Sequence, residues 1–365
     1  MRVLHVVKGL GPGGAERLLV SLAAVADRTQ VEPQVAYVLD WKQHLVPELE
    51  ALDVPTHLLA GPRGMADLRW PLRLRTLAKD VDVVHLHSPA VAAIARPVLR
   101  AQRRGPVLVS TEHNVWPSHG RLTRLGNAGT LPLDRVRWAV SEEVRASEWG
   151  PWQGRTEVLL HGAPVESIAR RRDARAIARN AEGWADDDVV VATVANLRVN
   201  KDYPNLFSAA ALALARAPRL RFVSIGQGPL ESELRVTLAA HHLGDRFVML
   251  GYHDEPISVI AGADMFALSS RHEGLPISLI EAMALGLPSV VTNVGGNAEV
   301  VTHERDGLLV PPANPEALAD ALVRLADDEP LRRRLGAAAQ QRSTDFDIAR
   351  TARIIEARYR SIVGP

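Results

Sequence analysis

The sequence predicts an α/β protein with two doubly wound halves, each built on a parallel sheet. Three observations support this prediction. Short apolar runs rich in β-branched residues alternate with longer helical segments along the whole chain. These runs are continuously apolar, as in parallel strands that helices cover on both faces. The rhythm breaks once near the middle of the 365 residues, and a chain of this length accommodates two domains.

Each half is expected to contribute its own strands and helices. In the first half we expect strands at Val3–Val7, Gln34–Leu39, Asp82–Leu86, Val107–Thr111, Val136–Val140 and Glu157–Leu160. In the second half we expect them at Val189–Ala195, Arg221–Ile225, Phe247–Leu250, Met265–Leu268, Ser289–Thr292 and Leu308–Val310. Helices are expected at Ala15–Arg28, Ala90–Arg104, Arg172–Asn180, Asn205–Arg216, Leu230–His241, Pro276–Leu285 and Pro315–Ala326.

The break in the rhythm follows Leu160, where glycine and proline precede a charged stretch. We place the hinge near residues 162–172. The predicted domains are residues 1–168, residues 169–345, and a terminal helix at residues 346–365 that crosses back to the first domain. The apolar positions expected on that helix are Ile348, Ala352, Ile355 and Tyr359.

Composition excludes several classes of protein. Apolar residues make up 47% of the chain and charged residues 23%, which is ordinary for a folded protein. The chain has no cysteine, so disulfides, thiolate nucleophiles and Cys-ligated metal centres are excluded. The charge-free stretch Ala282–Ala298 is short and contains proline and glycines, so it does not suit a bilayer-spanning helix. Lys8 interrupts the N-terminal apolar run too early for a signal peptide, and we expect a soluble, cytoplasmic protein.

The net charge of +1 conceals a basic window. Residues 62–137 contain 13 Lys/Arg against 5 Asp/Glu. Between Arg63 and Arg104, the window includes Leu68-Arg69-Trp70 and Leu72-Arg73-Leu74-Arg75. Such a surface suits contact with the anionic inner face of the membrane, or simply solvated helix faces.

A glycine loop joins the first expected strand to the first helix. Gly9, Gly11 and Gly14 match the spacing G-x-G-x-x-G, and Asp40 lies at the end of the second strand. This spacing is found in nicotinamide-dependent oxidoreductases, and it also occurs in a plain strand–helix turn. Free amides at such a helix start also suit a phosphate or a sugar, which would place Gly13 and Gly14 near the ligand.

A second loop follows the strand Met265–Leu268, where parallel sheets bind ligands. Gly274 permits close approach of a ligand, and Pro276 suits the first position of a helix. The amide of Leu275 and those after it then form a phosphate cradle. Glu273 just before the turn and Glu281 about two turns into the helix could bind hydroxyls at opposite ends of one ligand.

Basic residues and a further glycine turn lie at the same sheet edge. Arg198 and Lys201 follow the strand Val189–Ala195 and could neutralise a diphosphate leaving group. Gly226 and Gly228 follow the next strand, where their backbone could contact a nucleoside.

His113 stands at the end of a strand in the first half, where it could donate to a substrate hydroxyl. The other histidines, including His85 and His87, are expected to be structural or exposed. No metal ion is expected, because the sequence has no H-E-x-x-H motif.

The second half carries a specific series of motifs. Glu273-Gly274-Leu275-Pro276 with Glu281 forms E-x7-E, and Gly295-Gly296-x-x-Glu299 follows it. The first half contains Gly13-Gly14-Ala15-Glu16 and Glu112-His113-Asn114. Through these residues nearly the whole chain resembles the retaining GT-B glycosyltransferases of group 1, the mannosyltransferase- and sucrose-synthase-like family.

The resemblance implies two Rossmann-like domains facing across a cleft. It implies retaining transfer of a hexosyl unit from a UDP- or GDP-sugar, which is a co-substrate, with no separate cofactor and no metal. The acceptor would be a glycan, a lipid-linked or a small-molecule hydroxyl, in polysaccharide, glycolipid or other glycoconjugate biosynthesis. A nucleic-acid partner is not expected.

The resemblance also assigns roles to the residues of the second half. Glu273 and the two amides after it would hold the donor sugar, and Glu281 would bind the ribose hydroxyls. Lys201 and Arg198 would bind the diphosphate. The leaving diphosphate would itself accept the proton of the acceptor hydroxyl, which is front-face transfer.

In the first half, Gly13 and Gly14 would border the phosphates and the acceptor, and His113 would touch the transferred sugar. Two positions depart from the family pattern. Asn196 stands where many members have arginine, and His161 replaces a frequent asparagine.

Two alternatives stay open beside the transferase. One is an NAD-dependent oxidoreductase using the glycine loop, and the E-x7-E pattern argues against it. The other is a non-catalytic protein that binds a sugar nucleotide or a glycan. Only a measurement of activity distinguishes it from the transferase.

Overall fold

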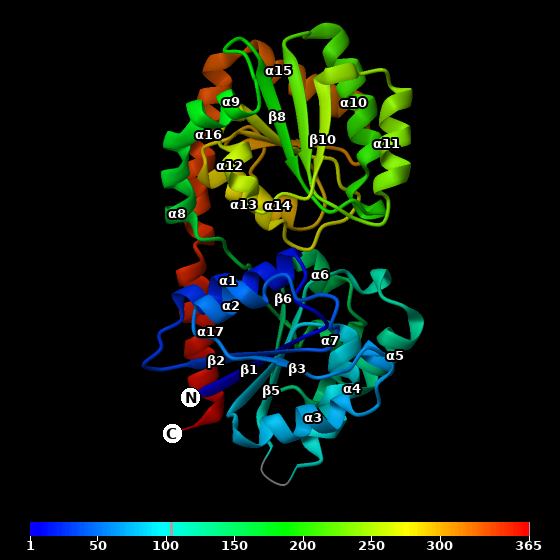
Figure 1. Cartoon of the computed structure of the whole chain (residues 1–365), viewed down its shortest axis with the longest axis vertical. Helices are drawn as coiled ribbons and strands as arrows, with labels where there is room; N and C mark the ends of the chain where they lie inside the picture. The colour runs from blue at the N-terminus through cyan, green and yellow to red at the C-terminus, as the bar shows by residue number, and fades with distance from the viewer. Residues whose placement is uncertain (103–104, 365) are drawn as a thin grey trace. The chain divides into compact units, whose positions relative to one another are not determined.

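The strands form two separate parallel sheets in the computed structural model, which describes residues 1–102 and 105–364 (Figure 1). The chain divides into two compact units. Met1–Gly162 and Ile348–Pro365 make up the first unit, and Ala163–Asp347 makes up the second. Each unit is α/β with parallel strand pairs, which confirms the predicted fold class.

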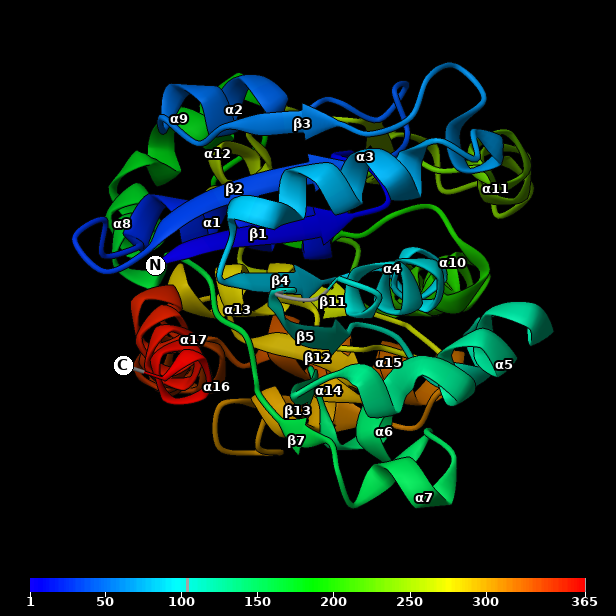
Figure 2. The same cartoon turned by 90° about the horizontal axis from the view of Figure 1, so that it is seen from below.

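In the first unit the strand order is β3-β2-β1-β4-β5-β6-β7, part of which can be followed in Figure 2. Its strands are β1 (Arg2–Val7), β2 (Glu32–Tyr37), β3 (Thr56–Leu58), β4 (Val83–Leu86), β5 (Val107–Glu112), β6 (Val136–Ala139) and β7 (Glu157–Val158). The chain winds outward on both sides of β1, as in a doubly wound sheet. The sequence pattern does not predict β3, because three residues are too few to show one.

Helices cover both faces of this sheet. The helices of this unit are α1 (Gly14–Val25), α2 (Val46–Ala51), α3 (Trp70–Leu77), α4 (Pro89–Arg100), α5 (Arg121–Thr130), α6 (Glu142–Ala146), α7 (Gly150–Gln153) and α17 (Ile348–Val363). Helices α1 and α17 share one buried cluster with the sheet, including Leu22 and Ile355. Helices α3 and α4 share another, including Trp70 and Leu99. The helix predicted over Ala90–Arg104 ends at Arg100, and residues 103–104 lie outside the described residues.

In the second unit the strand order is β10-β9-β8-β11-β12-β13. The strands are β8 (Val189–Val194), β9 (Leu220–Ile225), β10 (Phe247–Gly251), β11 (Met265–Leu268), β12 (Ser289–Thr292) and β13 (Gly307–Val310). The helices are α8 (Val165–Arg170), α9 (Arg175–Ala181), α10 (Tyr203–Arg216), α11 (Glu231–Ala240), α12 (Pro256–Ile260), α13 (Ile277–Ala284), α14 (Gly296–Val300), α15 (Pro315–Asp327) and α16 (Glu329–Ser343).

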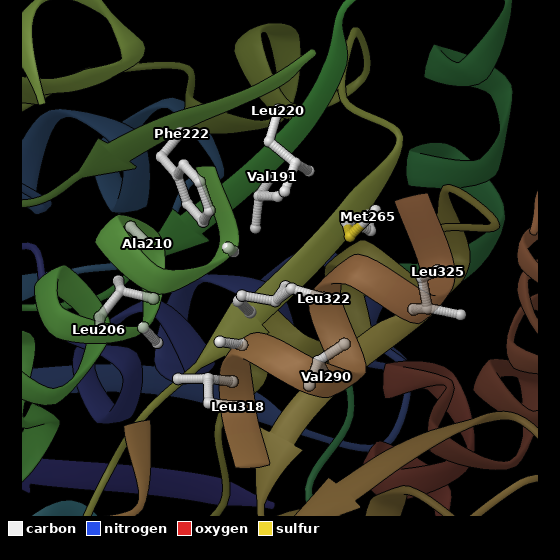
Figure 3. Packing of buried hydrophobic residues seen from close by; sticks show 14 of the residues in the cluster. Val191, Leu206, Ala210, Leu220, Phe222, Met265, Val290, Leu318, Leu322 and Leu325 are labelled. Carbon is white, nitrogen blue, oxygen red and sulfur yellow. The ribbon is translucent and has the colours of Figure 1, made fainter. Parts of the chain in front are cut away.

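The core of the second unit lies between its sheet and helices α10 and α15. Figure 3 shows Leu206 of α10 and Leu322 of α15 among the strand residues Val191, Phe222 and Met265. All of these side chains are at most 2% exposed. Burial of this many aliphatic and aromatic groups is the main stabilising contribution to such a sheet. The rigid sheet in turn fixes the loops at its carboxyl edge.

The division between the units differs from the predicted boundary after residue 168. Val165 and Ile168 of α8 are buried, and α8 packs against α13 of the second unit. The second unit therefore begins at Ala163. At the other end, α17 belongs to the first unit and begins at Ile348. Its side chains at Ile348, Ala352, Ile355 and Tyr359 are all buried.

Candidate functional site

The loops after β8 and β11 meet at the carboxyl edge of the second sheet, because these two strands are neighbours. The amide of Arg271 donates to the carbonyl of Asn200 at 2.8 Å. The Ser269 hydroxyl donates to the carbonyl of Lys201 at 2.9 Å. Backbone and hydroxyl hydrogen bonds therefore fix the two loops to each other.

Lys201 and Glu273, one from each loop, form a buried ion pair. The Lys201 ammonium donates to Glu273 Oε1 at 2.5 Å and to Oε2 at 2.7 Å. The Ser270 hydroxyl donates to Oε1 at 2.5 Å. The side chains of Glu273 and Lys201 are only 5% and 16% exposed. Both residues are predicted from the sequence, but their direct contact and the part played by Ser270 are not.

Asp202 is a further polar residue of this edge that the sequence does not single out. Its backbone is left-handed, with φ of 47°, a conformation that aspartate tolerates better than most residues. Its buried carboxylate accepts from Arg271 Nε at 2.7 Å, and this bond raises the pKa of Arg271. The pair fastens the β11 loop to the start of α10.

Helix α13 begins at Ile277, one residue later than the sequence predicts. Pro276 has an extended backbone, with φ of −80° and ψ of 102°, and it precedes the first turn instead of opening it. The Ser278 hydroxyl donates to the carbonyl of Val194 at 2.8 Å. This bond ties the start of α13 to the end of β8.

The start of α13 offers unused amides. Among the described residues, no hydrogen bond engages the amides of Gly274, Leu275 and Ile277. The turn is supported by Gly296, whose amide donates to the Gly274 carbonyl at 3.0 Å. A Cβ at Gly296 would lie 2.4 Å from that oxygen, so only glycine fits. Free amides at a helix start suit an anionic or hydroxyl-bearing ligand.

Glu281 lies in α13, half-buried. Because the helix begins at Ile277, Glu281 is just over one turn into it and not the expected two. Glu273 and Glu281 therefore flank the helix start, one in the loop and one on the helix.

Gly226 and Gly228 have a packing role that the sequence does not reveal. A Cβ at Gly226 would lie 2.0 Å from the carbonyl oxygen of Ala195, and Gly226 has a φ of +151°. A Cβ at Gly228 would lie 2.3 Å from the carbonyl oxygen of Leu197. The β8 and β9 loops approach so closely that both positions require glycine, whether or not a nucleoside binds there.

Arg198 differs from its neighbour Lys201. Its side chain is exposed, and its guanidinium group has no hydrogen-bond or ion-pair partner within the described part of the chain. It begins the short 3-10 turn Val199–Lys201. A free guanidinium beside a buried ammonium leaves positive charge at this edge for an anionic ligand.

The glycine loop of the first unit leads from β1 into α1, whose first residue is Gly14, preceded by Gly13. A Cβ at Gly9 would lie 2.7 Å from the Cβ of Lys42, so the loop packs tightly on the segment after β2. A Cβ at Gly13 would meet only the flexible Glu16 carboxylate. Asp40 lies in a turn beyond the end of β2.

His113 directly follows β5 and is half-buried. Its Nε2 lies 3.2 Å from Nδ1 of His87, and its amide donates to Glu112 Oε1 at 3.1 Å. Burial lowers the pKa of His113 to about 4, so its imidazole is neutral at physiological pH. A neutral imidazole suits a hydroxyl group better than a phosphate.

Only some of the side chains in the basic window, residues 62–137, are exposed. Trp70, expected among its exposed residues, is 1% exposed and lies in the core. Leu68 and Leu72 are 85% and 60% exposed, and Arg69 beside them is exposed. Among the described residues, no helix is both long enough and apolar enough to cross a bilayer.

Two protein-family models match the chain. The model of "Glycosyl transferases group 1" matches residues 174–342, and that of "Glycosyltransferase Family 4" matches residues 12–147. In the solved structure of HepE from Anabaena with UDP and glucose, the fold is similar, with a TM-score of 0.86 at 21% identity. That match covers 99% of this chain and 100% of HepE, and the shared fold is GT-B.

Relatives in sequence cover both units. The UDP-Gal:α-D-GlcNAc-diphosphoundecaprenol α-1,3-galactosyltransferase of Escherichia coli is 27% identical over 79% of this chain and 78% of its own length. The D-inositol 3-phosphate glycosyltransferase of Saccharomonospora viridis is 30% identical over 357 residues, which are 87% of this chain and 77% of the relative. With the two family models, this similarity shows that the chain belongs to the group 1 glycosyltransferases.

Proposed function

We propose that the protein transfers a hexosyl unit from a UDP- or GDP-sugar to an acceptor hydroxyl, with retention of anomeric configuration. The observation that carries this proposal is the Lys201–Glu273 pair beside the unbonded amides at the start of α13. Such a donor presents hydroxyls to a carboxylate and phosphates to cations and amides. UDP in the HepE structure and UDP-Gal in the name of the Escherichia coli relative support the donor class.

The proposed roles in the second unit follow the geometry of its edge. Glu273 and the adjacent amides bind the donor sugar, and Glu281 on α13 binds the ribose. Lys201 and the exposed Arg198 bind the diphosphate. Gly226 and Gly228 let the β9 loop lie close to the nucleoside.

In the first unit, His113 contacts the transferred sugar, and Gly13 and Gly14 border the phosphates and the acceptor. Family membership in the glycosyltransferases argues against the nicotinamide alternative for the same glycine loop.

In the proposed reaction the bond between the anomeric carbon and the diphosphate oxygen breaks. The acceptor oxygen bonds to that carbon on the same face, and its proton passes to the departing diphosphate. Lys201, Arg198 and the helix-start amides stabilise the negative charge that develops on the leaving group. Because these groups belong to the protein, we propose that the reaction needs neither a metal ion nor a cofactor.

A donor screen tests this function. UDP-glucose, UDP-galactose, GDP-mannose and NAD are compared by thermal shift, and donors that bind are assayed for release of UDP or GDP. We expect one nucleotide sugar to raise the melting temperature and to be consumed, and EDTA to leave the rate unchanged. The anomeric coupling constant of the product, measured by NMR, reports retention. Binding without turnover for every donor and acceptor tried would leave the non-catalytic alternative.

The acceptor is proposed to be a glycan, a small molecule or a lipid-linked sugar, the last named for the Escherichia coli relative. Exposed Leu68 and Leu72 beside Arg69 are the residues proposed to contact an anionic membrane. Sedimentation with liposomes of anionic and of neutral lipid tests this contact. Equal binding to both would refute it.

A further inference from the structure

Histidines gather at the carboxyl end of the first sheet. His5 is on β1, His85 is on β4, and His87, His113 and His161 follow strands of the same sheet. The rings of His85 and His87 are 4.0 Å apart, and those of His87 and His113 are 5.5 Å apart. Apart from His113, these residues are at most 7% exposed.

The strand register explains this gathering. His5 and His85 are direct partners in the parallel pairing of β1 with β4. His87 comes two residues after His85 and therefore lies on the same face of the sheet. The rings of His85 and His87, two residues apart on β4 and just after it, therefore lie beside the ring of His5 on β1.

Hydrogen bonds join three of these rings into a line. Nδ1 of His5 lies 3.0 Å from Nε2 of His87. Nδ1 of His87 lies 3.2 Å from Nε2 of His113. His87 thus uses both of its nitrogens, and His113 keeps Nδ1 for another partner.

A neutral imidazole has one N–H donor and one acceptor nitrogen. If His87 accepts from His5, it must donate to His113, whose hydrogen is then on Nδ1. If His113 donates to His87 instead, its Nδ1 is a bare acceptor. The hydrogen position on His113 is therefore linked to that on His5 through His87.

The surroundings keep this line neutral. Burial lowers the pKa of His5 and of His113 to about 4, and that of His87 well below its ordinary value. From β5, Glu112 Oε1 accepts from the amide of His113 and bonds the ring of His119.

Two further groups that face the line are neutral. From α17 the Tyr359 hydroxyl bonds the ring of His85. After β7, the His161 ring lies 5.5 Å from that of His113, and its pKa is also lowered by burial. The buried Nε2 of His161 has no partner within the described residues. Beside the unused Nδ1 of His113, this unsatisfied nitrogen of His161 also indicates that a polar ligand group binds in this region.

We propose that His87, with His5 behind it, is a positioning residue that determines which nitrogen of His113 carries the hydrogen, so that Nδ1 binds one hydroxyl of the substrate. This inference rests on the proposed function, in which His113 contacts the transferred sugar. A single fixed tautomer offers either a donor or an acceptor, and it therefore selects the orientation of that hydroxyl.

A metal ion is the competing explanation for the cluster. Nitrogens of His5, His85 and His87 all lie within 4.8 Å of one another. However, His85 bonds the hydroxyl of Tyr359 at 2.5 Å and that of Thr111 at 2.7 Å, so both of its nitrogens are engaged. Ligation would break one of these bonds as well as the line of histidines.

Histidine ring nitrogens observed by NMR in protein labelled with 15N-histidine test the proposal without any substrate. The signals of His113 are assigned from their loss in His113→Gln. We expect one tautomer of His113 in the wild type and a mixture of tautomers in His87→Phe. The control is Tyr359→Phe, which removes the partner of His85 and leaves the line intact, so His113 should be unchanged. An unaltered His113 in folded His87→Phe, or ligand-like shifts on adding Zn²⁺, would overturn the proposal.

Kinetics supplies the second measurement. We expect His87→Phe to lower kcat/KM for the sugar donor about tenfold, as for the loss of one hydrogen bond, while the affinity for the free nucleoside diphosphate is unchanged. His87→Gln, which keeps a donor and an acceptor, should recover part of the loss. In His87→Phe/His113→Gln the losses should not add.

If the wild type consumes no nucleotide sugar, the proposed function fails, and the NMR measurement still decides the role of His87. If His113→Gln slows transfer and His87→Phe does not, the positioning role is wrong.

Discussion

In the first unit, a line of neutral imidazoles lies at the carboxyl end of the sheet, whereas in the second unit an ion pair lies there. His5, His87 and His113 bond one another without a carboxylate in the line. Lys201 and Glu273 form a buried ion pair instead. Both sets are attached to strands of similar parallel sheets.

The difference shows that one architecture can prepare two kinds of binding. A neutral imidazole bonds hydroxyls and does not attract anions, and a lysine ammonium stabilises a phosphate. For a transferase this separation would suit a sugar in the first case and a diphosphate in the second. The chemistry lies in a few residues at the strand ends, and the sheets themselves serve as supports.

The largest effect is expected from Lys201→Ala. It removes a cation from the proposed diphosphate site and leaves the buried Glu273 carboxylate with Ser270 as its donor. Turnover should fall ~10³-fold, and the free energy of unfolding should fall by about 3–5 kcal/mol, as when one partner of a buried pair is removed. Donor-dependent release of UDP or GDP and urea unfolding measure the two effects.

Two variants control this prediction. Lys201→Ala/Glu273→Gln should recover stability without recovering turnover, because the buried charge is gone and the cation is still missing. Lys79→Ala, at an exposed position in the first unit, should change neither quantity. Wild-type turnover in Lys201→Ala would remove the charged edge from the mechanism.

The neutral state of the buried histidines should make the free energy of unfolding fall in acid. The buried histidines have a lower pKa in the folded state than the ordinary 6.5, so the unfolded chain binds more protons below that pH. Stability is therefore fully present above pH 6.5 and is lost as the pH falls toward 4, by about 1.4 kcal/mol per pH unit for each histidine that titrates. The raised pKa of buried Glu148 acts in the opposite sense and reduces the slope.

Urea unfolding at pH 7.5, 6.0 and 5.0 measures this loss. In Trp184→Phe the remaining tryptophans all belong to the first unit, so their fluorescence reports that unit alone. His161→Asn should make the pH dependence shallower. Constant stability of the first unit between pH 7.5 and 5.0 would contradict the assignment of neutral buried imidazoles.

Two glycines at the edges should respond differently to alanine. In Gly228→Ala the new Cβ meets the backbone oxygen of Leu197 at 2.3 Å, and the backbone cannot yield cheaply. We expect a loss of about 1–3 kcal/mol in the free energy of unfolding. In Gly13→Ala the Cβ meets only the end of the Glu16 side chain, which can turn away, so stability should change little. Equal losses in the two variants would show that close packing does not explain Gly228.

The smallest effect is expected from Glu281→Ala. If Glu281 binds the ribose, its loss should weaken binding of the nucleoside diphosphate about tenfold, the value of one or two hydrogen bonds, and leave turnover at saturation near that of the wild type. Isothermal titration calorimetry measures the affinity. Glu233→Ala, an exposed acid on α11, is the matched control. Unchanged affinity in Glu281→Ala would take this residue out of the nucleotide site.

Sequence reasoning succeeds where a pattern is local. The runs at Met265–Leu268 and Ser289–Thr292 are found as strands with the predicted bounds, because continuous apolar residues mark a covered strand. The helix predicted to begin at Pro276 begins at Ile277 instead. Proline is favoured near helix starts, but this preference does not distinguish the first helical residue from the residue before it.

Contacts between distant segments are beyond such patterns. Lys201 and Glu273 are 72 positions apart and meet because β8 neighbours β11, a strand order that composition does not reveal. The histidine line likewise depends on the register of His5 with His85. Both become visible only when the strands are placed.

Helix α17 gives the first unit an unusual order of assembly during synthesis. Tyr359 and Ile355 fill the same cluster as Val3 and Leu22, although they are made after the whole second unit. A ribosome-bound chain must therefore present the first sheet with part of one face uncovered until the second unit has been synthesised, while the second unit emerges as one uninterrupted segment. Loss of the final helix should thus make the early-synthesised half aggregate or recruit chaperones, and leave the later-synthesised half able to form.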